Sequence, residues 1–123
     1  MNAPLTYPRR GCGTIVWVAK GNDRPYEPGK VLTAQISAST ISFAALADGC
    51  EPNNDCRVNL TLDRTGSKFV GTAGSHAVPN DASVQCRAYS NAHRLALIGD
   101  WTEGAVKYCW HAEITTEPET TEP

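Results

Sequence analysis

Two side chains near the end of the sequence have types that could support nucleophilic or acid–base chemistry. Cys109 and His111 are two positions apart, so on a strand they would share one face with Lys107. A neighbouring cation and an imidazole can lower the pKa of a thiol and make it reactive. Only Glu113 could orient the pair, and a row of polar residues is also the usual outer face of a strand. Glu103 is a further candidate acid–base group.

The cysteines allow a disulfide, a metal site or free thiols, and five are present. Cys50 and Cys56 enclose a turn-like segment, Glu-Pro-Asn-Asn-Asp, which a disulfide could close in an oxidising compartment. The spacing is wider than the roughly two to four residues typical of a zinc hairpin, so no metal site is predicted. As free thiols they would behave as small apolar side chains, and Cys86 is expected in the core. An odd total leaves at least one cysteine unpaired within the chain, with Cys12 as the candidate.

No other catalytic or cofactor motif stands out in the sequence. The three histidines, His76, His93 and His111, are scattered and match no metal-ligand spacing. The chain has neither a glycine-rich phosphate loop nor a Gly-x-Ser-x-Gly nucleophile turn. We therefore expect no cofactor, and the residue pattern gives enzyme activity no positive support.

The charge distribution argues against nucleic acid as a partner. Residues 1–112 carry 11 Lys/Arg and 9 Asp/Glu, whereas residues 113–123 carry four Glu and no base. Neither part has the strong basic excess of a nucleic-acid binder. No run approaches the ~20 apolar residues of a membrane-spanning helix, so a membrane partner is not expected. Since no secretory signal is evident, a cytoplasmic protein is predicted; export is the alternative if the chain is a trimmed mature form.

Alternation of apolar and polar residues indicates strands along most of the chain. The clearest case is residues 56–63, where every second side chain is apolar. Residues 68–74 follow across a turn containing Gly66, which suits a hairpin because glycine accepts a positive φ. Residues 42–48 hold helix formers in series but could equally continue a strand. The other predicted strands are 14–18, 31–36, 40–44, 84–89, 93–98 and 105–115.

About eight strands with short connections must be antiparallel, because parallel pairs need long crossovers. The simplest way to hide their edges is closure into an up-and-down barrel, so an all-β antiparallel barrel is predicted over residues 1–115. A two-sheet sandwich is the alternative. Residues 116–123 repeat a Thr-Glu-Pro unit and are predicted to be a disordered acidic tail, since they cannot bury apolar surface.

The tripeptide Gly99-Asp100-Trp101, within a meander of about eight strands, resembles the Gly-x-Trp element of calycin-type barrels. That group contains the lipocalins and avidins. Lipocalins carry the element on their first strand, whereas here it lies in the last third of the chain. The resemblance implies a barrel whose open end or interior binds a small molecule or a peptide.

An eight-stranded barrel is just wide enough to be filled by side chains or to hold one small ligand. The expected inward positions mix large rings with small residues, which could leave a cleft that Tyr and Trp supply with polar groups. Close interdigitation of large and small side chains is the alternative. The candidate ligand-binding residues are Trp17, Trp101, Tyr108 and Trp110, with Trp101 nearer the Glu103 end than Trp110.

The sequence therefore predicts a non-enzymatic binding domain. Its partner would be a small molecule or a protein segment, recognised at the barrel mouth. One alternative is a small barrel enzyme, an isomerase or hydrolase, that uses Cys109, His111 or Glu103. The other is a phage or bacterial inhibitor protein that acts by surface contact. The sequence sets no oligomeric state.

Overall fold

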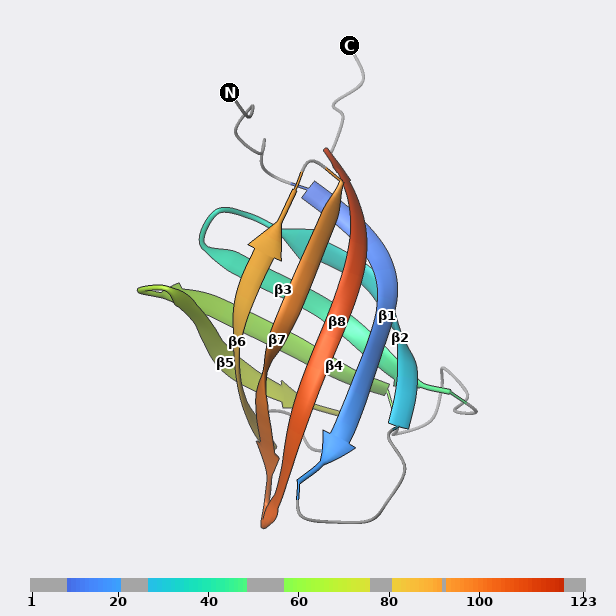
Figure 1. Cartoon of the computed structure of the whole chain (residues 1–123), viewed down its shortest axis with the longest axis vertical. Coiled ribbons are helices and arrows are strands. Elements are labelled where there is room, and N and C mark those ends of the chain that lie inside the picture. The colour runs from blue at the N-terminus through green and yellow to red at the C-terminus, as the bar shows by residue number, and fades with distance from the viewer. Residues whose placement is uncertain (1–8, 21–26, 49–56, 76–80, 92, 119–123) are drawn as a thin grey trace.

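Eight antiparallel strands form a closed barrel in the computed structural model, which describes residues 9–20, 27–48, 57–75, 81–91 and 93–118. Each strand pairs with the next and β8 pairs with β1, so no edge is left open (Figure 1). The predicted all-β up-and-down barrel is confirmed. The strands are β1 (Arg9–Ala19), β2 (Glu27–Ile36), β3 (Thr40–Ala47), β4 (Arg57–Thr65), β5 (Lys68–Gly74), β6 (Ala82–Ser90), β7 (Arg94–Glu103) and β8 (Val106–Pro118).

The segment with mixed helix and strand signals is part of β3. Its residues continue the ladder with β4, where Leu46 pairs with Arg57, and helix formers in series are overridden by this pairing. The described residues contain no helix that could span a membrane.

Two tight turns depend on glycine. Gly66 between β4 and β5 has φ 64°, and Gly104 between β7 and β8 has φ 60°. Side chains with a Cβ rarely adopt this left-handed conformation, so glycine permits both hairpins. The β7–β8 hairpin closes on the pair Glu103 and Val106, which sets Trp101 opposite Tyr108.

The last strand is longer than predicted. β8 continues to Pro118, and Arg9, Arg10 and Gly11 of β1 pair with its last three residues. The predicted tail boundary at residue 116 therefore lies inside the barrel wall, because the ladder with β1 extends over these residues and Thr116 is buried against Arg9. The rest of the predicted tail, residues 119–123, lies outside the described residues.

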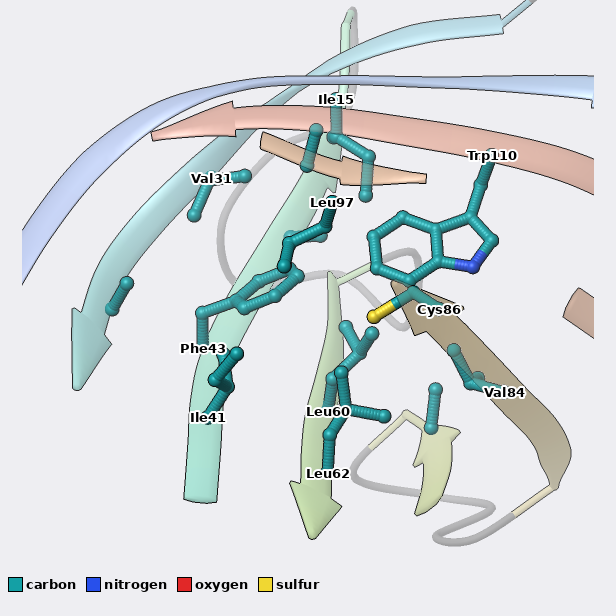
Figure 2. Close-up of a cluster of buried hydrophobic side chains, with 14 of the residues drawn as sticks. Ile15, Val31, Ile41, Phe43, Leu60, Leu62, Val84, Cys86, Leu97 and Trp110 are labelled. Atoms are coloured by element: carbon teal, nitrogen blue, oxygen red, sulfur yellow. The ribbon is translucent and has the colours of Figure 1, made fainter. Parts of the chain in front are cut away.

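The barrel interior holds one hydrophobic core. On β8 the alternation is strict, with Trp110, Ala112 and Ile114 buried and the residues between them exposed. Figure 2 shows the Trp110 indole pointing from β8 into the barrel beside Cys86. Cys86 is buried as predicted, and burial raises the pKa of its thiol to about 12. The large side chains thus occupy the middle of the barrel.

Candidate functional site

One end of the barrel is hollowed. This end, called the mouth, carries the start of β1, the end of β8 and the β2–β3, β4–β5 and β6–β7 turns; the start of β1 and end of β8 lie at the top of Figure 1. A cavity of about 210 Å³ opens there, called the mouth cavity. Its apolar lining residues come from five strands and the β2–β3 turn and are Ile36, Ala38, Ile41, Phe69, Ala88 and Leu95.

The rim of the mouth cavity is polar, with Ser37, Arg64, Ser67 and Ser90 among its lining residues. Arg64 continues the inward-facing series of β4 after Leu60 and Leu62, and in the ladder it pairs with Phe69 of β5. The strand alternation therefore directs an arginine to the same side of the wall as the core. Beyond the last core layer, that position opens onto the cavity.

Side-chain hydrogen bonds fix the shape of two of the mouth turns. The Ser37 hydroxyl accepts hydrogen bonds from the amides of Thr40 at 3.0 Å and Ser39 at 3.3 Å. Asn91 does the same in the β6–β7 turn, where its Oδ1 accepts from the amides of His93 at 3.0 Å and Arg94 at 2.9 Å. Such local bonds satisfy turn amides that no ladder partner reaches. The mouth is thus preformed on two sides.

A second, smaller space adjoins the mouth cavity. Its volume is about 10 Å³, and it shares Ile36, Ser90 and Leu95 with the larger one. Arg9 and Arg94 also line it. That volume suffices for about one water molecule.

Arg9 is a buried cation at the seam between β1 and β8. Its side chain is 5% exposed, and Nε donates to Thr116 Oγ1 at 2.9 Å while Nη2 donates to the Thr116 carbonyl at 3.4 Å. These bonds help offset the cost of removing the guanidinium from water. The pair locks the first residue of β1 to the end of β8.

The rings proposed from the sequence as ligand contacts pack against one another. Trp101 makes edge contacts with Trp17 and Trp110, at centroid distances of 5.7 Å and 6.0 Å. Their exposed fractions are 3%, 8% and 1%, respectively, and Tyr108 is half-buried opposite Trp101. None of the four lines the mouth cavity. The role of these residues in ligand binding stays a prediction.

The Gly-x-Trp tripeptide has a structural explanation in this barrel. A Cβ on Gly99 would lie 1.8 Å from the carbonyl oxygen of Gln85, so only glycine allows β7 to approach β6 so closely there. The Trp110 indole of β8 then donates to two carbonyls, Gln85 O at 3.3 Å and Asp100 O at 3.2 Å. Gly99 and Trp101 thus serve core packing at this place.

The candidate catalytic residues lie on the outer wall. Cys109 and His111 are exposed on β8, and Glu103 is exposed at the β7–β8 turn, three ladder positions from Cys109. Cys109 faces Asp100 of β7, whose carboxylate accepts a hydrogen bond from Lys20 at 2.5 Å. This bond lowers the pKa of Asp100 and raises that of Lys20, and the nearby Cys109 adds a smaller upward contribution to Lys20.

Three cysteines are free thiols in the described part of the chain. Cys12 and Cys109 are exposed and Cys86 is buried. Cys50 and Cys56 lie outside the described residues, so the disulfide between them stays a prediction. Over the described ranges, no three His, Cys, Asp or Glu side chains come together as a metal site.

No protein-family model matches the chain, and no curated protein matches its sequence. The closed barrel of eight sequentially paired strands is compatible with the architecture of calycin-type proteins. The likeness is therefore one of architecture.

Sequence reasoning missed the residues of the mouth cavity. They come from separate turns and strand ends, so no single segment displays them. One signal was available: Arg64 continues the apolar series of Leu60 and Leu62 on the inward face of β4. An arginine at an inward position marks a place where the barrel interior meets water.

Proposed function

We propose that the protein is a non-enzymatic binding domain that holds a small molecule in the mouth cavity. The observation that carries this proposal is the cavity itself, about 210 Å³ in volume, which is lined by both apolar and polar side chains and exposes more polar than apolar surface. An apolar cavity of about 150 Å³ is large enough for benzene, so the mouth could hold about one substituted ring. The resemblance to calycin-type barrels supports a ligand at the same place.

The side chains around the cavity favour binding over catalysis. The part of the lining that the structure describes contains no histidine, cysteine or carboxylate, which are the groups that most often transfer protons near neutral pH. Serine hydroxyls and a guanidinium can instead orient a ligand through hydrogen bonds. Cys109, His111 and Glu103 belong to the outer wall and offer a ligand in the mouth no contact.

The proposal is tested by screening the full chain against a small-molecule fragment library, followed by two-dimensional amide NMR. We expect shifts at Ser37, Ser67 and Ser90 for the fragments that bind. Ala88→Leu fills the cavity from β6 and should weaken those fragments at least tenfold. Ala96→Leu, on the outer face of β7, is the matched control and should leave binding unchanged. A library without any fragment that shifts the mouth, or equal loss in both variants, would refute the proposal.

Recognition of a protein by surface contact is the second candidate, and exposed apolar side chains favour it. Tyr89, Ile98 and Val18 are 56%, 48% and 43% exposed on the outer wall of β6, β7 and β1. An inhibitor protein would bury such side chains against its target. Ile98→Lys should abolish capture of a protein partner and leave fragment binding intact. Ala88→Leu should weaken fragment binding and leave capture of the protein partner intact.

A further inference from the structure

Three arginines surround the mouth, and they carry an inference about the ligand. Arg64 lines the mouth cavity, and Arg9 and Arg94 line the space that adjoins it. Among the residues that the structure describes, no aspartate or glutamate lines either space. Around the two spaces the described lining residues therefore carry three positive charges, and Arg94 also lines a neighbouring space with Glu113.

Arg64 is the cation best placed to contact a ligand. Within the described residues its side chain makes one hydrogen bond, from Nε to the Gly66 carbonyl at 3.4 Å. That distance is long for an N–H···O bond, and no described carboxylate forms an ion pair with this arginine. The other N–H groups of the guanidinium can therefore face the cavity. Their fork geometry matches the paired oxygens of a carboxylate or a phosphate.

Arg94 adds to the field at the same place. Arg9 is buried nearby but is already engaged, since it donates to Thr116 and makes further interactions. Arg94 is exposed on the rim, at the first position of β7. A concave site lined by one sign of charge concentrates counter-ions and raises their rate of association.

We infer that the ligand is a small amphipathic oxyanion, with a carboxylate or phosphate group on Arg64 and an apolar body in the cavity. The inference rests on the proposed binding function and deepens it by naming the charge of the ligand. Ile36, Ile41 and Leu95 form buried walls for the apolar body, and Phe69, the ladder partner of Arg64, adds an aromatic ring to the lining. Scaled from benzene in about 150 Å³, the cavity of about 210 Å³ fits about eight non-hydrogen atoms.

Matched pairs of compounds test the charge separately from the apolar body. The pairs are phenylacetate with phenylacetamide, and benzyl phosphate with benzyl alcohol, titrated into the full chain and followed by amide NMR. At least one anion should bind tenfold or more tightly than its neutral partner, and its affinity should fall as salt is raised. The tighter anion identifies the headgroup.

Arg64→Gln should remove the preference for the anion and leave binding of the neutral compound within about twofold. Arg57→Gln is the control, since Arg57 is an exposed residue at the far end of the same strand and its loss changes the net charge equally. Both variants are checked for folding by their melting temperatures.

Neutral and anionic partners that bind equally would overturn the inference while the binding function stands. A preference for anions that survives Arg64→Gln, or that Arg57→Gln removes as well, would overturn the placement of the headgroup on Arg64. If neither anion binds, the inference fails outright. The fragment screen, which includes neutral compounds, then decides separately whether the mouth is a binding site.

Discussion

At the scale of one residue, burial of Cys86 in the core sets how readily its thiol ionises and reacts. Its thiol is buried among apolar side chains, and burial disfavours the thiolate. Cys12 and Cys109 are exposed thiols on the outer wall. Reactivity toward thiol reagents should therefore follow burial, because the thiolate is the reacting form. The sequence predicted the core position of Cys86 from its apolar neighbours two positions away.

The raised pKa of Cys86 makes a prediction about alkaline stability. The pKa is about 12 in the folded chain and about 9 in the unfolded chain, so only the unfolded thiol ionises between these values. The contribution of the neutral Cys86 thiol to the free energy of unfolding is fully present below pH 9. It is lost as pH rises toward 12, by up to about 1.4 kcal/mol per pH unit. Urea denaturation from pH 8 to 10.5 should show this loss relative to Cys86→Ala. Parallel pH profiles for the two proteins would contradict it.

At the scale of elements, the alternation of apolar and polar residues predicted the strands well in the segments where that alternation is regular. The predicted segments 56–63 and 105–115 alternate cleanly, and their described parts lie in β4 (Arg57–Thr65) and β8 (Val106–Pro118), where buried and exposed side chains alternate. The start of β1 was missed because Gly11 and Gly13 have no side chain with which to mark a face. The extension of β8 was missed because pairing with the start of β1 orders it, and Thr116 is buried there as a polar residue bonded to Arg9. Backbone pairing between distant segments leaves no local signal.

Trp110 joins three neighbouring strands, and that role can be measured. Its indole on β8 donates to a carbonyl of β6 and a carbonyl of β7. Trp110→Phe keeps an aromatic ring but loses this donor, and should lower the free energy of unfolding by about 1–3 kcal/mol. Trp17→Phe is the control, because that indole makes no hydrogen bond to the described residues while its ring belongs to the same cluster. Equal destabilisation of the two variants would show that ring volume alone matters.

At the scale of the whole molecule, closure of the barrel produces the candidate site. The mouth cavity is lined by strand ends and turns that lie far apart in the sequence and meet because β8 returns to β1. The number and direction of strands could be predicted, and hence that a mouth exists. Which residues reach it depends on where each strand ends relative to its neighbours, and no single segment encodes this. The rings predicted to contact a ligand, Trp17, Trp101 and Trp110, pack against one another, and none of them lines the mouth cavity, so their role in binding stays a prediction.

Closure also predicts which part of the C-terminus matters for stability. Deleting residues 119–123 should leave the melting temperature within about 1 °C, because the segment has no apolar side chain. Deleting residues 116–123 removes Thr116, which accepts two hydrogen bonds from the buried Arg9, and the ladder positions beside it. Hydrogen bonds to a buried charge contribute about 1.5–3 kcal/mol each to stability. The deletion also exposes Arg9 to water, and hydration of the guanidinium offsets part of the lost hydrogen-bond energy. The longer deletion should therefore lower the melting temperature by about 10 °C.

Thr116→Val in the full chain separates the two contributions to this seam. The variant keeps the backbone ladder and the carbonyl that accepts from Arg9, and loses only the hydroxyl at 2.9 Å. Its melting temperature should fall between those of the full chain and the longer deletion. If both truncated chains have the same melting temperature as the full chain, pairing between β1 and β8 beyond residue 115 adds no stability. The barrel would then be held closed by the ladder nearer its middle, where Ile15 and Trp17 pair with Ala112 and Trp110.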